Sequence, residues 1–509
     1  MAISQKVYKA LRTTLQAAVT LFACSSIIFS APARQADSFM DSIGVCVHMF
    51  MNGLYTNNYS FVKSKLLAAN IRHVRDDLAV DRPIGTAAWK DMAASGIKIG
   101  FILNQAWATV DTYRSYLKTN GLISAADYFE GPNEFDGAQS NWVSVLSNYQ
   151  ADIYTKMKGD PETASIPVIA PSFIINHASY RSNLGNISAI ADYGNCHPYP
   201  GGAMPSTSQT TNEIAACAIT TGTNPVFITE IGYQNATNTT NGHHPASELA
   251  AGIYLPRIYF DMFSRGIVRT YYYQFLDHIT DGGALTNVEA YFGLIRYDLS
   301  DKPAYTALKN MTALVKDPGP SFTPAGLVFT VSGTPVKTVL LQKRDGSFYL
   351  ALWREVSVWN NSSRTNIIPP ASNVTVTLPG AYTVAVYSPT DSSNALQNFT
   401  NVSSMTLSLQ GEVKVLKIES ITSSTNRIIT ALSGVHYKKD GVSIVFIDIP
   451  DSTEGSVYSL TGRMIATLTK DARGLVWNVS GNARTIPGVY LCRLRTLTET
   501  KIVKVIMKP

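Results

Sequence analysis

Two glutamates follow short apolar runs of the sequence and could together carry out acid–base and nucleophilic chemistry. Glu134 closes the segment Glu130-Gly131-Pro132-Asn133-Glu134, and Glu230 closes Ile228-Thr229-Glu230. The two are 96 positions apart. Two carboxyl groups across a cleft are the minimum equipment for cleaving a glycosidic bond. One protonates the leaving oxygen, and the other attacks the sugar or activates water.

Three further side chains could assist this pair. Asn133 directly precedes Glu134, and its amide can bind the sugar hydroxyl beside the reacting carbon. Arg75 would favour the ionised form of Glu230, with an ion pair to Asp76 or Asp77 as the alternative interpretation. His197 also follows an apolar run, where the alternative is a core histidine bonded to the backbone.

Aromatic and weaker candidates lie near the same positions. Trp107 and Trp142 could stack on sugar faces, or could pack under loops. His48, Asn104, Asp277 and His278 are weaker candidates. His243 and His244 fall in an Asn/Thr-rich loop, and we expect them to face solvent rather than to bind a metal.

The elements that must position these residues recur regularly. Apolar runs that alternate with helix-like stretches lie at Ile43–His48, Ile71–Arg75, Lys98–Asn104, Asp127–Asn133, Pro167–Pro171, Ala191–His197, Pro225–Glu230 and Arg269–Phe275. Each unit averages about 32 residues, so Glu134 and Glu230 fall at the ends of the fourth and seventh runs. Eight such units predict a (β/α)₈ barrel, an α/β fold, over residues 37–319. An open doubly wound sheet is the competitor, and it usually displays a Gly-rich phosphate loop that this sequence lacks.

The pattern changes after the linker Lys316–Pro320. Residues 322–420 alternate apolar and polar side chains with period two, which predicts an all-β sandwich. Trp353 and Trp359 within it are expected to pack in a core or interface rather than to bind sugar. A polar linker, Ile421–Arg427, precedes a last, small β-rich domain at 428–509.

At this point residues 42–315 resemble the clan A glycoside hydrolases, a superfamily of retaining (β/α)₈ enzymes. Its mark is Asn-Glu at the end of strand four and a second Glu at the end of strand seven, matched by Asn133-Glu134 and by Ile228–Tyr233. The resemblance implies Glu134 as general acid/base and Glu230 as nucleophile. It also implies Arg75 near the nucleophile, and a hydrogen bond to the nucleophile from the Cys196-His197-Pro198-Tyr199 segment.

Strand eight departs from that pattern. Many clan members have a Trp there as the floor of the sugar subsite, whereas this chain has Tyr272-Tyr273-Gln274-Phe275. Phe292-Gly293-Leu294 and Lys302-Pro303-Ala304-Tyr305 again match the stretch before the last helix. The predicted substrate-binding residues are Arg75, Asn133, His197, Tyr199, Tyr233, Gln274, Trp107 and Trp142.

The C-terminal domain resembles a type IX secretion sorting domain. The matching residues are Val457–Arg463, Trp477, Gly488–Leu491 and the basic ending Lys501–Lys504. This resemblance implies secretion machinery as a partner and export to the cell surface or medium. A plain terminal β-domain is the alternative.

The N-terminus is typical of an export signal. Residues 1–33 carry three positive charges, then an apolar stretch, then Ala31-Pro32-Ala33, a small-x-small cleavage pattern. A membrane anchor is the alternative, but the apolar stretch is shorter than the ~20 residues needed to span a bilayer. We therefore expect this segment to be removed, which would leave no membrane-spanning segment. Residues 1–33 carry +3 and residues 484–509 carry +5 of the net +6, so the remainder sums to −2 and nucleic-acid binding is not expected.

Cysteine and histidine spacing predicts no structural or catalytic metal, and chemistry carried by Glu134 and Glu230 needs no cofactor. The sequence contains no CxxC and no HExxH. Cys196 and Cys217 are either a disulfide or two buried thiols.

The sequence therefore predicts a secreted or cell-surface hydrolase of a β-linked glycan. A non-catalytic glycan-binding protein or adhesin on an inactive barrel is the alternative hypothesis. A serine hydrolase is a more distant one, and the sequence has no G-x-S-x-G.

Overall fold

The computed structural model describes residues 27–29, 33–82, 84–174 and 178–420, and the segments 436–440, 443–447, 454–460, 462–471, 474–479, 488–495 and 500–507. The chain divides into two compact units, Met1–Ser420 and Ile421–Pro509. Most of the predicted export signal and the linker at 421–427 lie outside the described residues.

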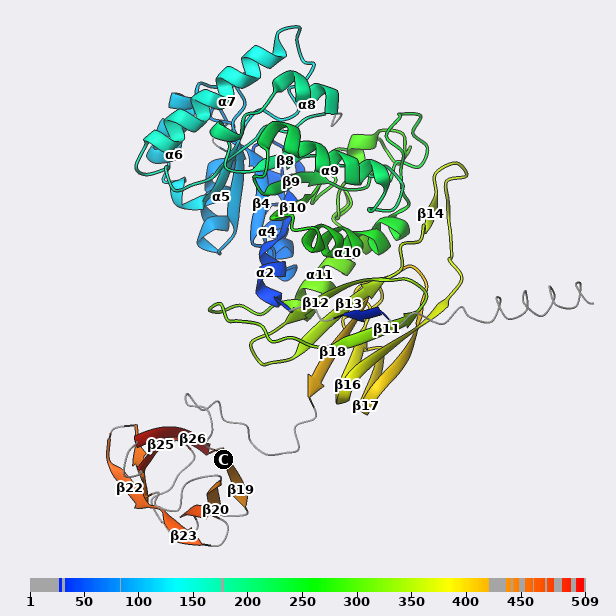
Figure 1. The fold of residues 1–509 in the computed structure, drawn as a ribbon. Helices are drawn as coiled ribbons and strands as arrows, with labels where there is room; N and C mark the ends of the chain where they lie inside the picture. The colour runs from blue at the N-terminus through cyan, green and yellow to red at the C-terminus, as the bar shows by residue number, and fades with distance from the viewer. Residues whose placement is uncertain are drawn as a thin grey trace, which may run out of the picture. The chain divides into compact units, whose positions relative to one another are not determined.

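The first unit contains a parallel barrel (Figure 1). Its strands are β3 (Ile43–Cys46), β4 (His73–Asp77), β5 (Lys98–Ile102), β6 (Ala126–Glu130), β7 (Val168–Ile169), β8 (Gly194–Cys196), β9 (Val226–Ile231) and β10 (Arg269–Tyr272). They pair in the order β7-β6-β5-β4-β3-β10-β9-β8, and a parallel bridge between Ile169 and Tyr193 joins the two ends. The predicted (β/α)₈ barrel is confirmed. Strand β6 ends at Glu130, so Glu134 lies four residues beyond it.

Helices follow the strands around the barrel. They are α2 (Ala36–Asp41), α3 (Leu54–Asn57), α4 (Tyr59–Ala68), α5 (Ile84–Ala94), α6 (Val110–Thr119), α7 (Trp142–Gly159), α8 (Ala178–Leu184), α9 (Ser208–Thr221), α10 (Glu248–Ser264) and α11 (Pro303–Val315). Side-chain oxygens of Thr109, Thr207 and Ser247 cap α6, α9 and α10 by accepting backbone N–H groups. Pro303 occupies the first turn of α11, where its missing N–H costs nothing.

Aromatic rings fill the interior of the barrel. Tyr128, Phe227 and Tyr271 are buried there and pack edge to face. Glycine makes room for two of them, because a Cβ on Gly44 would lie 2.5 Å from the Tyr271 ring and one on Gly100 would lie 2.1 Å from Tyr128. The barrel is therefore a packed core, and a ligand must bind at its end.

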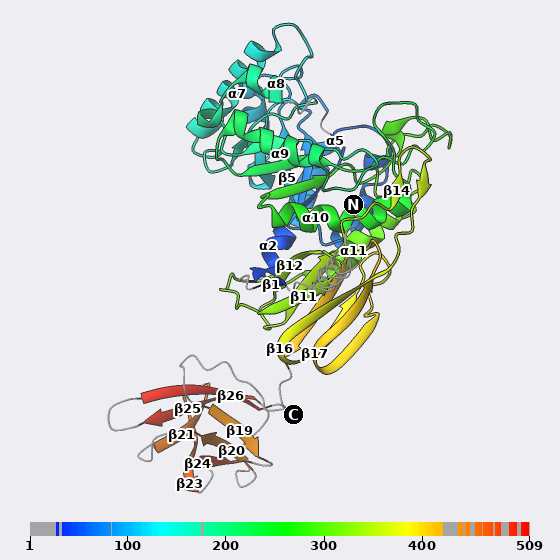
Figure 2. The same cartoon turned by 45° about the vertical axis from the view of Figure 1, so that its right-hand side comes forward.

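The predicted sandwich is a single sheet folded over on itself. Its strands are β1 (Ile27–Phe29), β2 (Arg34–Gln35), β11 (Phe329–Gly333), β12 (Lys337–Gln342), β13 (Phe348–Trp353), β16 (Ser372–Tyr387), β17 (Gln397–Leu409) and β18 (Lys414–Ser420). The first half of β16 pairs with β11 and its second half with β18, so this long strand belongs to both layers (Figure 2). Strand β1 pairs with β11 although it precedes the predicted cleavage pattern, and removal of the signal stays a prediction.

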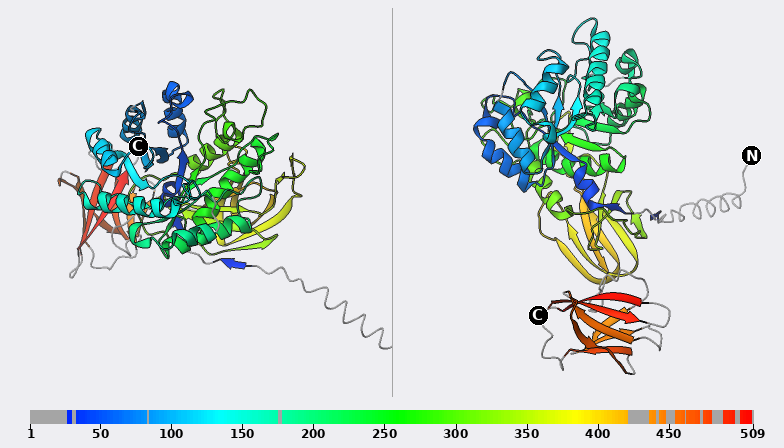
Figure 3. Two further views of the ribbon diagram at one scale, coloured as in Figure 1. Left: turned by 90° about the horizontal axis from the view of Figure 1, so that it is seen from above. Right: turned by 90° about the vertical axis from the view of Figure 1, so that its left-hand side faces the viewer.

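The barrel and the sandwich pack through α10 and α11, which lie between the barrel strands and the sheet (Figures 1 and 3). Trp353 and Trp359 are 1% and 4% exposed within the same core as these helices, which confirms their packing role. A hairpin of β14 (Trp359–Asn360) and β15 (Thr365–Asn366) extends from the sandwich beside the barrel loops.

The second unit consists of two antiparallel sheets. One contains β19 (His436–Asp440), β20 (Ser443–Ile447), β23 (Thr469–Asp471) and β24 (Gly474–Asn478), and the other β21 (Glu454–Ser459), β22 (Met464–Thr467), β25 (Gly488–Arg495) and β26 (Thr500–Met507). Buried residues of both sheets, Trp477 and Cys492 among them, form one core. No helix in the described part of the chain is both long and apolar enough to cross a membrane.

Candidate active site

A cavity of about 520 Å³ opens where the barrel strands end. Each of the eight strands or the loop after it contributes to the wall. The lining includes His48, Arg75, Asp77, Ile102, Glu134, Ile174, His197, Tyr199, Glu230, Tyr273, Glu289 and Phe292. This is the end of a (β/α)₈ barrel at which reactive groups gather.

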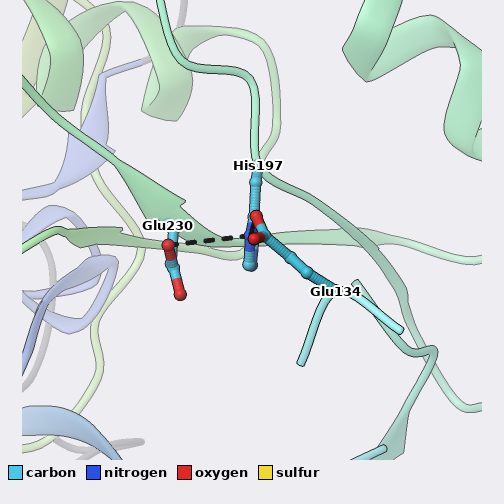
Figure 4. Close-up of side chains that lie close together, drawn as sticks. All are labelled: Glu134, His197 and Glu230. Atoms are coloured by element: carbon cyan, nitrogen blue, oxygen red, sulfur yellow. Dashed lines mark hydrogen bonds and ion pairs between the residues drawn. The ribbon is translucent and has the colours of Figure 1, made fainter. Parts of the chain in front are cut away.

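The two predicted glutamates meet in this cavity (Figure 4). Glu230 is the penultimate residue of β9 and is buried, whereas Glu134 lies on the loop after β6. One carboxylate oxygen from each and one ring nitrogen of His197 all lie within 4.8 Å of one another. Glu134 has φ of 46°, a left-handed conformation that costs a non-glycine residue about 1–3 kcal/mol and is common at functional sites.

Glu230 is held by two donors. The Arg75 guanidinium Nη1 lies 2.6 Å from one carboxylate oxygen, and the Tyr199 hydroxyl donates to the other at 2.6 Å. Burial alone would raise the pKa of Glu230, but the charges of His197 and Arg75 and these hydrogen bonds lower it below its usual value. Glu230 is therefore kept ionised.

Glu134 is hydrogen-bonded to His197. Nδ1 of His197 lies 2.7 Å from Glu134 Oε1, and Nε2 lies 2.9 Å from the Thr229 hydroxyl oxygen. The single Thr229 proton has two acceptors, Asn195 Oδ1 and Glu130 Oε1, so its oxygen accepts a hydrogen bond from Nε2–H. One proton then remains between Nδ1 and Glu134.

The charges around His197 stabilise the protonated form of its ring. Burial lowers the pKa of His197, but the charge of Glu230 and the hydrogen bond and charge of Glu134 raise it above its ordinary value. His197 therefore holds its proton at a higher pH than a free imidazole would. The hydrogen-bonded pair of His197 and Glu134 thus lies beside an ionised Glu230.

Glu130 lies at the centre of this network and is completely buried. Its two oxygens accept from Nε and Nη2 of Arg75 at 2.7 and 2.9 Å, a forked ion pair. Arg75 thus pairs with Glu130 and Glu230 rather than with Asp76 or Asp77, which decides between the two sequence interpretations. Sequence reasoning quoted Glu130 as part of a motif but assigned it no role.

Asn133 presents its amide to the cavity. Its Oδ1 accepts from Arg75 Nη2 at 2.6 Å and from the Ser172 hydroxyl at 3.3 Å. Both acceptor positions are thereby occupied, which leaves Nδ2 as the group that Asn133 can offer to a ligand in the cavity it lines.

Four of the predicted substrate-binding residues do not line the cavity. Tyr233 is buried and donates to the Ala203 carbonyl, and Gln274 is buried with its oxygen 3.4 Å from the Tyr55 hydroxyl. Trp142 packs against Phe173 and Tyr180. Trp107 is 38% exposed, and its ring lies beside Phe50 and does not line the cavity.

Strand eight still contributes an aromatic wall, but through a neighbouring residue. Tyr273, one position before Gln274, lines the cavity together with Phe292, and their ring centroids are 5.1 Å apart. The register of this strand end directs Tyr273, and not Gln274, at the cavity. Nothing in the sequence distinguishes these two neighbours.

The solvent-facing prediction for His243 is wrong. Its ring lies 5.3 Å from Tyr199 and 5.4 Å from Phe292 and lines the cavity, because its loop folds back over the barrel end. His244 is exposed, as expected. Asp77 and Glu289 also line the cavity without having been singled out as site residues.

The weaker rim candidates have separate positions. His48 lines the cavity with His278 behind it, the two ring centroids 4.9 Å apart. Asp277 is in a buried ion pair with Lys302 at 2.8 Å. Asn104 accepts at its backbone carbonyl from Tyr113. Only His48 of this group reaches the cavity.

The spacing of Glu134, His197 and Glu230 would allow these three residues to bind a cation together. Arg75 competes with such an ion, because its guanidinium already contacts Glu230 at 2.6 Å. Cys46, Cys196, Cys217 and Cys492 are buried free thiols, so the open question of a Cys196–Cys217 bond is resolved in favour of thiols.

No protein-family model and no curated protein sequence matches the chain. Among solved structures, it is similar to the GH39 enzyme from Xanthomonas axonopodis pv. citri, at 12% identity and a TM-score of 0.51, over 77% of this chain and 96% of that one. A monomeric β-xylosidase from Caulobacter crescentus CB15 is similar at 12% identity and a TM-score of 0.51, over 77% and 98%. The chain shares their fold. At this identity the likeness extends to the fold alone.

Proposed function

We propose that this protein is a retaining glycoside hydrolase that cleaves β-linked glycans. The observation that carries the proposal is the pair Glu134 and Glu230, with carboxylate oxygens within 4.8 Å at the end of a (β/α)₈ barrel. Retaining enzymes have carboxyl groups about 5–5.5 Å apart, whereas inverting ones need about 6.5–9.5 Å to admit a water. An oxygen–oxygen separation of at most 4.8 Å supports the retaining arrangement.

In the first step, the glycosidic bond is exchanged for an ester to the protein. Glu134 donates its proton to the glycosidic oxygen, and Glu230 attacks the anomeric carbon as the bond to that oxygen breaks. Arg75 and Tyr199 keep Glu230 ionised and aimed, through contacts of 2.6 Å each. The Asn133 amide donates to the hydroxyl beside the reacting carbon.

In the second step, water releases the sugar. Glu134, now a carboxylate, takes a proton from a water molecule. The water oxygen attacks the anomeric carbon as the bond between that carbon and Glu230 breaks. His197, whose Nδ1 lies 2.7 Å from Glu134 Oε1, stabilises the carboxylate form of Glu134 before the water is deprotonated. The configuration of the sugar is retained because two displacements have occurred.

The glutamates are tested by substitution to glutamine. We expect Glu230→Gln to lower kcat by about 10⁴-fold or more, and Glu134→Gln to lower it by about 10²–10⁴-fold for unactivated glycans. Both variants should fold, because Arg75 keeps its ion pair with Glu130. Reducing ends released from a panel of plant, algal and microbial polysaccharides, with proton NMR of the first-formed anomer, measure both activity and stereochemistry.

Glu419→Gln serves as the matched control, since Glu419 pairs with Lys417 on the sandwich surface away from the cavity. Near-normal turnover in both active-site variants would refute the assignment. A first-formed product of inverted configuration would refute the retaining mechanism even if the glutamates proved essential. Binding without hydrolysis across the whole panel would instead support a glycan-binding protein.

A further inference from the structure

The cavity is markedly acidic. Its described lining contains five acidic residues besides Asp76, whose side chain points away from it: Asp77, Glu134, Glu213, Glu230 and Glu289. Arg75 is the one arginine or lysine in the same described lining, and its guanidinium is already paired with Glu130 and Glu230. A negatively charged ligand would therefore meet no free permanent cation there.

The histidines of the lining do not compensate. Burial and the neighbouring His278 lower the pKa of His48 to about 3, and burial lowers the pKa of His243. Both are neutral at pH 7. His197 is engaged with Glu134 and Thr229.

Asp77 is the carboxylate best placed to meet a ligand. It is the last residue of β4, two positions after Arg75, so the two side chains point to the same inner side of the barrel. The intervening Asp76 points outward, to Trp89 Nε1 and the Met49 N–H. The Asp77 carboxylate accepts no hydrogen bond from another described residue and faces the cavity.

The pKa of Asp77 reflects the negative charge of its neighbours as well as its burial. Burial raises the pKa of Asp77 to about 7, and Glu130 and Glu230 add to this, against the opposing charge of Arg75. A donor from a ligand would remove this penalty, whereas an acidic group would add to it. Glu289, at the mouth, adds a second acceptor, with its carboxylate 3.4 Å from the Tyr273 hydroxyl.

We infer that the cavity selects a sugar that carries hydroxyl or amino groups and no acidic group, and that Asp77 enforces this selection. This inference rests on the proposed function for the nature of the ligand. Asp77 accepts a hydrogen bond from a hydroxyl or ammonium group of the bound sugar. Uronic acids and sulfated sugars are excluded because no cation is available for their charge.

The test uses 4-nitrophenyl β-thioglycosides, whose sulfur linkage resists hydrolysis. Three ligands are compared in both the gluco and the galacto series: the neutral sugar, its C6 carboxylate and its 2-amino form. Isothermal titration calorimetry on the full chain at pH 7 and low salt should give binding of the neutral sugar in at least one series. We expect the carboxylate to bind about tenfold more weakly or worse, and the amino form more tightly.

Asp77→Asn should reduce the discrimination against the carboxylate by about tenfold and remove the advantage of the amino form. Glu419→Gln, which removes the same charge from the sandwich surface, should leave both ratios unchanged. Equal binding of neutral and acidic sugars, unchanged ratios in Asp77→Asn, or no binding of any ligand would overturn the inference. Failure of the proposed function would instead appear as the absence of hydrolysis of the oxygen-linked glycosides while this binding order persists.

Discussion

At the scale of single residues, Glu130 connects the two glutamates proposed to be catalytic. It pairs with Arg75, which contacts Glu230, and it accepts a hydrogen bond from Thr229, which binds His197 and so reaches Glu134. Because Arg75 divides its charge between two carboxylates, Glu230 keeps more basicity than it would beside an undivided guanidinium. We therefore propose Glu130 as a positioning residue rather than a catalytic one.

Glu130→Gln should shift the acid limb of the kcat/KM profile to lower pH. Removing the negative charge leaves Arg75 wholly to Glu230, which lowers the pKa of Glu230 and weakens it as a nucleophile. We expect kcat at pH 7 to fall by about tenfold or more. Glu130→Asp keeps the negative charge but shortens the side chain. We therefore expect it to lose activity while the acid limb of its kcat/KM profile stays at the same pH. An unchanged limb in Glu130→Gln would contradict this role.

At the scale of elements, the β14–β15 hairpin of the sandwich supports a loop of the barrel. Arg364, between the two short strands, donates to the carbonyls of Thr237 and Thr239 at 2.5 Å each. That loop carries Asn241 and His243, which line the cavity. The hairpin, which extends beside the barrel loops (Figure 1), thus holds a loop that lines the cavity.

Arg364→Ala should raise KM several-fold, about 1 kcal/mol of binding, and change kcat by less than a factor of two. The reason is that a released loop must be ordered each time substrate binds, while the reacting groups stay in place. Arg354→Ala is the matched control, since Arg354 also donates to backbone carbonyls, those of Pro370 and Leu409, but within the sandwich. Steady-state kinetics of both variants would decide, and equal effects would point to general destabilisation.

At the scale of the whole molecule, the two ends of the barrel have different tasks. The end opposite the cavity holds a cluster of charges at the strand starts: Arg269 and His73 contact Asp127 at 2.5 and 2.8 Å and Asp41 at 3.1 and 2.9 Å. Burial opposes ionisation of Asp127, but His73 and Arg269 lower its pKa below the ordinary value. His73 and Arg269 also lower the pKa of Asp41. Such clusters stabilise the barrel rather than act on substrate.

Asp127→Asn should lower the free energy of unfolding at pH 7 by about 3 kcal/mol, because buried partners lose their counter-charge. A carboxyl group with a lowered folded-state pKa stabilises fully above its unfolded pKa, about 3.9, and loses this as pH falls through the folded value. The difference between wild type and variant should therefore shrink below about pH 4. Urea unfolding at several pH values measures it, with the exposed Asp111→Asn as control. A constant difference would contradict the assignment.

The fold and the reacting pair could be predicted from the sequence because their signals are local. Apolar runs of strand length recur about every 32 residues, and all eight became barrel strands. Parallel strands of one barrel end at the same face, so residues at the ends of runs four and seven had to meet. Glu134, Glu230, Arg75, His197 and Tyr199 accordingly share one cavity.

Only the tertiary structure decided which neighbours reach the cavity. Tyr273 lines it while Gln274 is buried, and His243 folds over it from a loop that appeared solvated. The choice of Glu130 as the partner of Arg75, 55 residues away, likewise depends on the pairing of separate strands. The physical reason is that a side chain's direction at a strand end, and the path of a loop, are set by contacts between segments distant in the chain. Local sequence carries no record of these contacts.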